Sequence, residues 1–339
     1  MHDSDRRRKL LFVLLLGISA LVLAPSRRRV YLTRQSLTPS RRSAAATLLA
    51  AKDDKSYISA FGFDVRTFDI ILTKFKPFLP PAPTLKRRPR SLTPRLHLSL
   101  VLYYLTSPQR QKSIALVFGL TPAAVSRSIW SGLSAMFDMM AADPDTWAIK
   151  WPTAAVMTDM AAAVRAREPL LKGVFGFVDG LNLRIYQPSN IDEQNAYYNG
   201  WLADTYCSQI ASGLYTLLSD PARTPPPFAL LADSAFPYGK ELTGRILSRP
   251  KDNVAAKEKD GAVHLLWEAI IRQRQAAEWG MRALQGAFGR LDLRLPTHKA
   301  KRALLLSVVF SLHNFRARNV GLNQIKEVYF PQWQAARRE

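Results

Sequence analysis

Cysteine is almost missing from this chain, since Cys207 is the only one among 339 residues. A single thiol excludes an internal disulfide framework and a metal centre built from several thiolates. Acidic residues are also scarce, with 26 Asp and Glu against 48 Lys and Arg, which gives a formal net charge of +22. This excess favours polyanions as partners, because binding them releases counterions from phosphate backbones.

The positive charge is concentrated near the start of the chain. Residues 1–95 hold 20 Lys and Arg and 6 Asp and Glu, so +14 of the +22 lies there. A basic N-terminal part before a more balanced body is common in proteins that handle DNA, and an anionic membrane surface is the competing partner. We expect DNA as the partner, a second DNA-binding subunit encoded elsewhere as a further one, and the nucleus as the location.

The first 30 residues combine basic and apolar segments. The apolar run from Leu10 to Ala24 is shorter than the roughly 20 residues that a bilayer-spanning helix needs. Arginines flank the apolar run on both sides. No small-residue cleavage site lies between the run and the arginines that follow it. Residues 1–30 are therefore either a buried or interfacial helix or a membrane anchor, the latter implying membrane association as an alternative location. Residues 31–83 are predicted to be a basic linker with a small helical lead-in.

Residues 84–160 have the pattern of a helical DNA-binding domain. An acid-free basic run leads into an apolar helix around Leu96–Leu105. Further on, Gly119 is expected to stop one helix, Thr121 to cap the next, and Pro122 to occupy its first turn. In a helix-turn-helix the second helix reads bases through its N-terminal residues. The alternative is an ordinary helical hairpin. The residues expected to bind DNA are Lys86, Arg87, Arg88, Arg90, Arg110, Lys112, Ser126 and Arg127.

Two aspartates are associated with strand-like apolar runs in the second half of the chain. Asp179 interrupts the run from Gly173 to Tyr186, and Asp233 ends the apolar part of the run from Phe228 to Pro237. A carboxylate in such a strand is costly unless it is paired or holds a cation. With Glu278, from an expected helix, the two aspartates could converge on Mg²⁺, which takes few carboxylates and shares its shell with water and phosphate oxygens.

Five motifs occur in the order DGLNL, QNAYYNGW, LLADSAFP, AEWGMRALQGAFGRL and LHNFRARNVGLNQI. Together they resemble the DDE superfamily endonucleases related to Harbinger-type transposases, in their fungal-type forms, over about residues 60–335. The resemblance implies an α/β fold, with an RNase H-like catalytic core at residues 170–330 preceded by an all-α helix-turn-helix domain. It further implies hydrolysis of DNA phosphodiester bonds by two Mg²⁺ or Mn²⁺ ions held on Asp179, Asp233 and Glu278.

The third acid depends on how the family pattern E-R-A-F-G is placed. The frame that we prefer puts the acid at Glu278 and also matches the later aromatic residue and Leu291. The rival frame matches GAFG at Gly286–Gly289 and puts Gln285 at this position, which leaves no carboxylate there.

The chain departs from the family after Ile210, where two further strands and a turn are missing. Their loss would leave the strand before Asp179 with fewer hydrogen-bonding partners. The causes to consider are a wrongly assigned intron, a genuine deletion, and a domesticated copy that binds DNA without cutting it. A catalytically inert DNA-binding protein is therefore the first alternative to an endonuclease, and a membrane-anchored basic protein is the second.

Replacing Lys86, Arg87, Arg88 and Arg90 by Ala is expected to weaken binding to all duplex DNA sequences alike. Each lost phosphate contact flattens the salt dependence, making the slope of log affinity against log salt concentration less negative by about 0.9. Replacing Arg127 by Ala should instead relax sequence preference, because base contacts carry specificity. Anisotropy titrations on several duplexes at several salt concentrations measure both effects. An Arg127→Ala protein with the parent's preferences would show that the second helix does not read bases.

Overall fold

The computed structural model describes residues 32–80, 92–199, 204–209, 213–233, 236, 244–250, 259–320 and 331. The chain divides into two compact units, Met1–Leu37 and Thr38–Glu339. Of the first unit only residues 32–37 are described, and they include the 3₁₀ helix η1 (Arg34–Ser36). The fold described below is that of the second unit.

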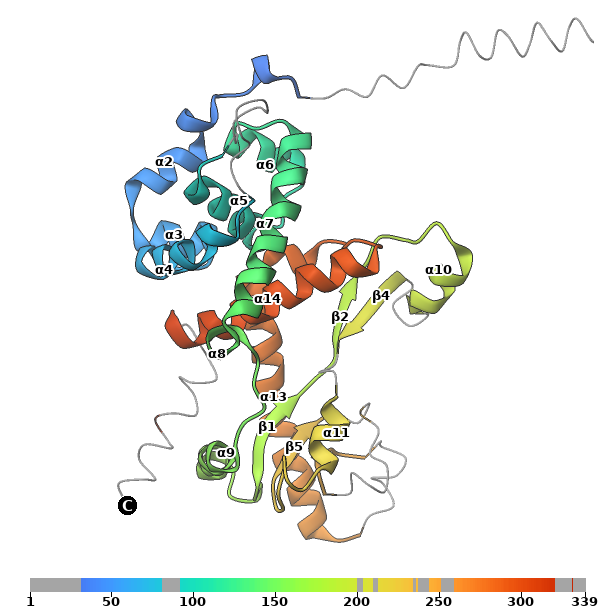
Figure 1. Ribbon diagram of the computed structural model, residues 1–339. Coiled ribbons are helices and arrows are strands. Elements are labelled where there is room, and N and C mark those ends of the chain that lie inside the picture. Colours follow the sequence, from blue (N-terminus) through green and yellow to red (C-terminus); the bar gives the residue numbers. More distant parts are fainter. Residues whose placement is uncertain are drawn as a thin grey trace, which may run out of the picture. The chain divides into compact units, whose positions relative to one another are not determined.

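The first part of this unit is helical, and the second part mixes helices with short strands (Figure 1). The helical elements are η2 (Ser40–Arg42), α2 (Ala44–Ala51), α3 (Asp54–Phe61), α4 (Val65–Phe75), η3 (Lys76–Phe78), α5 (Pro94–Thr106), α6 (Gln111–Phe118), α7 (Pro122–Ala142), α8 (Pro144–Trp147) and α9 (Ala154–Arg167). The mixed part contains β1 (Val174–Val178), β2 (Leu181–Arg184), α10 (Ile191–Tyr197), β3 (Tyr198–Asn199), β4 (Asp204–Gln209), α11 (Leu214–Ser219), β5 (Ala229–Ala232), β6 (Ile246–Leu247), α13 (Gly261–Ala287), η5 (Gly289–Asp292) and α14 (Lys299–Asn319). The mixed α/β class expected from the sequence is confirmed.

The predicted helix, glycine turn and helix is present as α6, Gly119 and α7. Gly119 has a positive φ of 62°, and the chain continues through Leu120, whose N–H donates to the carbonyl of Ala115 at 3.0 Å. The side chain of Thr121 accepts the N–H of Ala124, and Pro122 is the first residue of α7. These are the cap and turn functions that the residue types favour, because glycine tolerates a left-handed backbone and threonine satisfies a free amide.

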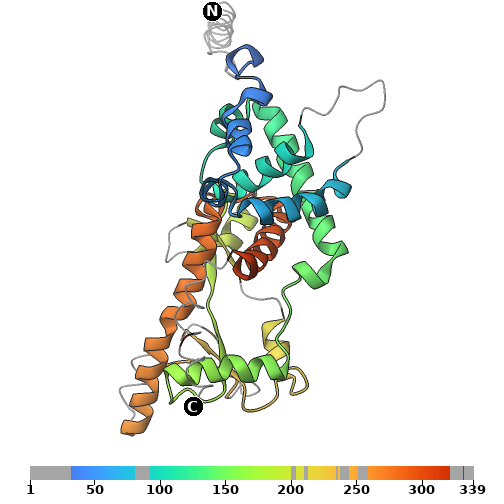
Figure 2. The same ribbon diagram turned by 90° about the vertical axis from the view of Figure 1, so that its left-hand side faces the viewer.

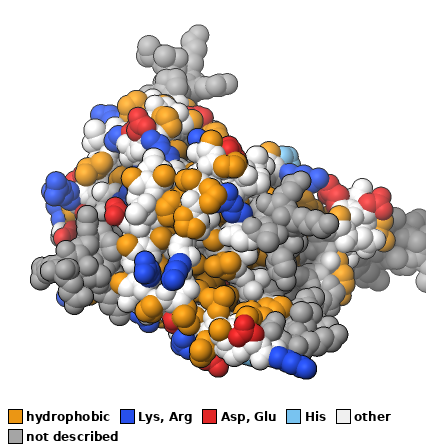
Figure 3. Space-filling model, turned by 90° about the horizontal axis from the view of Figure 1, so that it is seen from below, with side chains coloured by type: hydrophobic (Ala, Val, Ile, Leu, Met, Phe, Trp, Pro, Cys, Tyr) orange, Lys and Arg blue, Asp and Glu red, His pale blue; other side chains and the backbone are white. Residues whose placement is uncertain are grey.

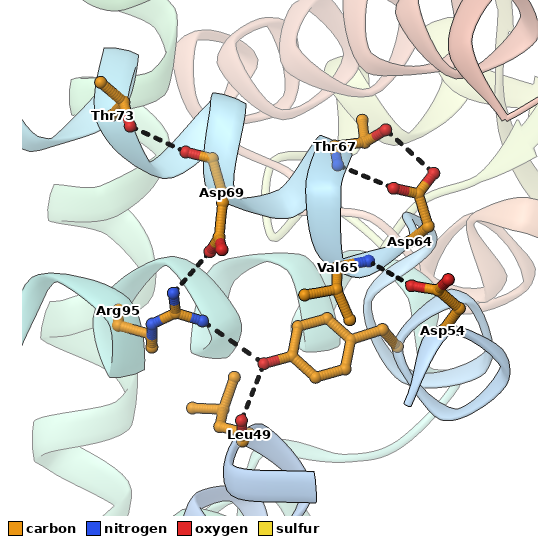
Figure 4. A network of polar contacts seen from close by, with 9 residues as sticks. Leu49, Asp54, Asp64, Val65, Thr67, Asp69, Thr73 and Arg95 are labelled. Carbon is orange, nitrogen blue, oxygen red and sulfur yellow. Dashed lines mark hydrogen bonds and ion pairs between the residues drawn. The ribbon is translucent and has the colours of Figure 1, made fainter. Parts of the chain in front are cut away.

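The core of the helical part is aromatic, and Arg95 connects its helices (Figure 4). The rings of Phe61 and Phe68 lie 5.2 Å and 5.3 Å from that of Tyr57, all three fully buried. Arg95 of α5 donates to the carboxylate of Asp69 and to the hydroxyl of Tyr57, which itself donates to the carbonyl of Leu49. A polar group in such a core must be hydrogen-bonded, and this chain of contacts meets that requirement across α2, α3, α4 and α5.

The last long helix, α14, returns to the helical part and packs against α7 and α8. The ring of Phe315 lies 4.3 Å from that of Trp147 and 6.2 Å from that of Phe63. Arg316 donates to the carbonyl of Gly62 at 2.8 Å. The helical part is thus completed by residues from near the end of the chain.

Three parallel strands form one sheet in the order β1-β5-β6. Helix α13 packs on one face, where Ala269 and Ala276 meet Val174 and Leu231. Helix α11 packs on the other face, where Leu214 and Leu218 meet Phe175 and Leu230. The sheet therefore lies between helices on both faces, and Figure 2 shows α13 as one long helix beside it.

Within the described ranges β1 pairs with β5 alone, so its other edge has no strand partner. Helix α9 packs along β1 and contributes to the clusters on both faces, through Met157 and Ala161 on one and Val164 on the other. Apolar side chains of α9 therefore shield the strand that leads to Asp179.

The other strands form a separate antiparallel sheet in the order β2-β4-β3. Arg294 holds it to the segment before α14 by donating to both carboxylate oxygens of Asp204, at 2.9 Å and 2.7 Å, and to the carbonyl of Ile185. The N–H of Thr205 and then Arg294 lower the pKa of Asp204. The chain leaves the first sheet at Asp179 and enters the second at Leu181, so the run from Gly173 to Tyr186 is two strands instead of one.

Replacing Gly119 by Ala is expected to lower the free energy of unfolding by at least about 2 kcal/mol. About 1 kcal/mol comes from placing Ala at a positive φ, and the rest from overlap. A Cβ at this position would lie 2.0 Å from the carbonyl oxygen of Thr38. The control is Gly213→Ala, because Gly213 has φ +74° with nothing near its Cβ position and should lose only the first contribution. Equal losses of stability in urea titrations would show that the close approach to Thr38 does not matter.

Candidate functional site

Asp179 and Asp233 lie opposite each other at the carboxyl ends of two adjacent parallel strands. Asp179 follows Val178, the last residue of β1, and Asp233 follows Ala232, the last residue of β5. Val178 and Ala232 are partners in the β1–β5 ladder. Continued by one residue, this register makes Asp179 and Asp233 neighbours on adjacent strands. Adjacent strands of a sheet lie about 4.8 Å apart.

Both aspartates lie on the same side of the sheet, because side chains alternate between the two faces along a strand. Val178 and Ala232 contribute to the apolar cluster on the α11 side. Since successive side chains alternate, Asp179 and Asp233 come on the opposite side, which α13 covers. Both residues are half-buried, and Oδ1 of Asp179 accepts the N–H of Gly180 at 2.7 Å. Two half-buried carboxylates, those of Asp179 and Asp233, therefore lie at the same edge of the sheet.

Glu278 lies on α13 but is not brought together with the aspartates. The Glu278 side chain is 46% exposed and lies 3.9 Å from the guanidinium of Arg282. Gln285, from the rival frame, is about two turns further on the same side of the helix. Among the described residues no group of three or more His, Cys, Asp or Glu is arranged to hold a metal ion.

Two residues at this edge were not identified from the sequence: Ser248 and Arg249. Leu247 of β6 pairs with Leu231 of β5, so the continued register places Arg249 beside Asp233. The hydroxyl of Ser248 is buried and has no hydrogen-bond partner among the described residues. The carboxyl edge thus carries Asp179, Asp233 and Arg249 in a row, two carboxylates and one guanidinium. The signal in the sequence was only the apolar pair Ile246 and Leu247 directly before Ser248, which is shorter than the apolar run before Asp233.

The second candidate site is the α6–α7 pair. The two helices are bent by 96° with respect to each other, within the range of 90–120° typical of a helix-turn-helix. On α6 and just before it, Lys112 and Arg110 are exposed; at the start of α7, Arg127 is exposed and Ser126 half-buried. No acidic side chain of the described residues pairs with Arg110, Lys112 or Arg127. These cations therefore remain available to an external anion.

Some predicted features fall outside the described residues. They include the basic residues Lys86, Arg87, Arg88 and Arg90, and the apolar run from Leu10 to Ala24. In the described part of the chain, no single helix has the length and apolar character needed to cross a membrane; α6 and α7 meet that test only as a pair, with the bend between them.

Two residues from the motifs have structural partners. His313 of α14 is largely buried beside Phe288, and burial lowers its pKa, as does the nearby Arg316. Its ring therefore forms part of the packing of α14, and its buried Nδ1 has no hydrogen-bond partner among the described residues. Tyr197 accepts a hydrogen bond from Arg302 at 2.9 Å and lies under its guanidinium, so it connects α10 to α14.

A separate pocket of about 480 Å³ lies where α9 ends, lined by Arg167, Glu168, Arg272, Gln273 and Gln275. Glu168 is buried and accepts two hydrogen bonds from Arg272, at 3.0 Å and 3.3 Å. This ion pair connects α9 to α13 before β1 begins, and none of the predicted site residues lines the pocket.

The chain was compared with known proteins at three levels. No protein-family model, no curated protein and no solved structure matches it. The features of this chain that bear on its function are therefore the two candidate sites and the motifs in the sequence.

Proposed function

We propose that this chain is a DNA-binding protein with a metal-dependent endonuclease core of the transposase-derived DDE type, related to the Harbinger group. The observation that carries the proposal is the β1–β5 register, which places Asp179 and Asp233 opposite each other. A parallel order β1-β5-β6 with helices on both faces is compatible with an RNase H-like core that has lost the strands on the far side of β1. Nuclear location follows from the proposed substrate.

The residues at the carboxyl edge fit a divalent cation. Mg²⁺ is commonly bound by one or two carboxylates, and water and phosphate oxygens complete its shell. Asp179 and Asp233 supply such a pair, and the second carboxylate oxygen of Asp179 has no partner among the described residues. A bound ion would activate a water or a 3′-hydroxyl and stabilise the leaving oxygen of a phosphodiester. Arg249, beside Asp233, is placed to hold a phosphate oxygen by a charge-assisted hydrogen bond.

The proposed DNA-binding element is the α6–α7 pair. Its 96° bend would allow the N-terminal residues of α7, Ser126 and Arg127, to approach base edges. Arg110 and Lys112 would then contact phosphates on either side, which fixes orientation without reading sequence. The net charge of +22 supports a polyanionic partner for the whole chain.

A second candidate function is DNA binding without cleavage. It is favoured by the position of Glu278, which leaves two carboxylates at the sheet edge instead of three. It is also favoured by β1, which pairs on one side only within the described ranges. The two candidates share the α6–α7 surface and differ only in what the carboxyl edge does.

Replacing Asp179 or Asp233 by Asn is expected to abolish Mg²⁺- or Mn²⁺-dependent nicking of supercoiled DNA and to reduce Mn²⁺ affinity. Each change removes a ligand, and DNA affinity should stay the same or rise because a negative charge near phosphate is lost. Calorimetry with Mn²⁺ and a plasmid-nicking assay measure the two effects. Asp159→Asn is the control, since Asp159 is an exposed acid on α9.

Three outcomes separate the candidates. Nicking by the parent chain that either variant loses supports the endonuclease. A parent that binds DNA but neither nicks it nor binds Mn²⁺ identifies the inert DNA-binding protein. Parent-like nicking by Asp179→Asn or Asp233→Asn would disprove the assignment of these carboxylates.

Replacing Glu278 by Gln is expected to leave Mn²⁺ affinity within about twofold of the parent, an effect below about 0.4 kcal/mol. Its carboxylate lies near Arg282, and among the described residues it forms no metal-holding group with Asp179 and Asp233, so it is not placed to bind an ion at the sheet edge. The same calorimetry measures it, with Gln285→Ala as the control for the rival frame. A loss as large as that of Asp179→Asn would mean that α13 turns to bring Glu278 to the metal.

A further inference from the structure

A contact between α14 and α7 joins two distant parts of the chain on the surface next to the proposed reading helix. The ammonium of Lys301, in the first turn of α14, lies 5.1 Å from the centre of the Trp130 ring on α7. The two helices also pack against each other. The aromatic ring attracts the cation electrostatically and so holds the Lys301 side chain over α7.

Most of α7 and all of α14 belong to stretches of sequence that contain no acidic residue. One stretch runs from residue 70 to residue 137 and includes α5, α6 and most of α7; the other runs from residue 293 to residue 326 and includes α14. They are far apart in the sequence, and the α7–α14 contact brings them together. By contrast, on the face seen from below in Figure 3, basic and acidic side chains are both present and scattered among apolar ones.

Several cations of these two stretches already have structural partners. Arg95 pairs with Asp69, Lys74 with Asp143 and Arg294 with Asp204. Arg302 is buried and donates to the carbonyls of Pro296 and Thr297. Lys301 differs from all of these, because it is exposed and its contact is an uncharged ring. Its positive charge is therefore not neutralised by an acid of the described residues.

Lys301 lies next to the outward face of α7, through its contact with Trp130. Ser126, Arg127 and Trp130 follow each other at helical spacing, so Trp130 lies one turn beyond the residues expected to approach bases. The buried face of α7, with Val125, Ile129 and Leu133, lies on the other side. Lys301 therefore lies beside the outward face, next to the reading positions, where a DNA backbone passes when a helix enters the major groove.

We propose that Lys301, held over Trp130, binds a phosphate of the DNA backbone next to the site that α7 reads, so that α14 forms part of the DNA-binding surface. The inference rests on the proposed DNA binding by α6 and α7. It adds an element from the C-terminal part of the chain to a surface that the sequence assigned to residues 84–160 alone.

The test is the salt dependence of DNA binding by the full chain, measured by anisotropy with a fluorescent duplex. Lys301→Gln is expected to make the slope of log affinity against log salt concentration less negative by about 0.9, the value for one lost phosphate contact. Lys301→Arg should retain the slope, since Arg also binds phosphate and stacks on an aromatic ring. Trp130→Leu should weaken binding less than Lys301→Gln, because the cation stays but is no longer held in place.

Lys299→Gln is the matched control. Lys299 is exposed in the same first turn of α14, and two residues separate it from Lys301 by about 200° around the helix. Both substitutions remove one positive charge. A general effect of net charge would therefore flatten the salt dependence of DNA binding equally in the two variants. Circular dichroism of each variant checks that the helices are intact.

The outcomes distinguish this inference from the proposed function. A parent-like slope for Lys301→Gln, with weakened binding by Arg127→Ala, overturns the role of Lys301 and leaves DNA binding by α7 in place. Equal losses for Lys299→Gln and Lys301→Gln also overturn it. A parent chain that shows no salt-dependent binding to duplex DNA overturns both the inference and the proposed function.

Discussion

Parallel pairing of β1 with β5 is the constraint on which the carboxyl-edge site depends. In a parallel ladder the carboxyl ends of both strands meet at one edge, so residues that directly follow the strands become neighbours although they are far apart in sequence. Asp179 and Asp233 are brought together in this way. A shift of the register by one residue would move either aspartate to the other face of the sheet, away from α13.

That register is stabilised by apolar packing on both faces and along the open edge. Helices α11 and α13 bury alternate residues of β1 and β5, so that each face specifies which side chains point inward. Helix α9 packs along β1 where the described ranges show no further strand. The ion pair between buried Glu168 and exposed Arg272 connects α9 to α13 just before β1 begins. A short sheet of three strands is thus held in one register by helices that enclose it.

The helical part depends on a different interaction, the return of α14 to pack on α7 and α8. Phe315 stacks near Trp147, and Arg316 reaches the carbonyl of Gly62. Removing the end of the chain would therefore expose the core of the helices that precede the sheets. This arrangement also places the first turn of α14 beside the outward face of α7, which is why a proposed DNA-binding surface draws on both ends of the sequence.

Local features of the fold could be predicted from the sequence, because the chemistry that determines them is local. Gly119, Thr121 and Pro122 specify the turn between α6 and α7 through backbone conformation and capping, and the apolar run before Asp233 specifies β5. The separation of Gly173–Tyr186 into strands of two different sheets could not be predicted in this way, because periodicity reports which residues are apolar and not which strand lies beside them.

What the sequence alone determined about this protein is its charge, the turn between α6 and α7 and the association of one aspartate with each of two apolar runs. Only the tertiary structure decided which of the predicted acids become neighbours: the β1–β5 register places Asp179 beside Asp233, and Glu278 forms no metal-holding group with them among the described residues. The same holds for Arg249 and Lys301, whose neighbours come from distant segments. The physical reason is that capping and strand formation involve residues a few positions apart, whereas a site depends on strand register and helix rotation, which are fixed when the whole core packs.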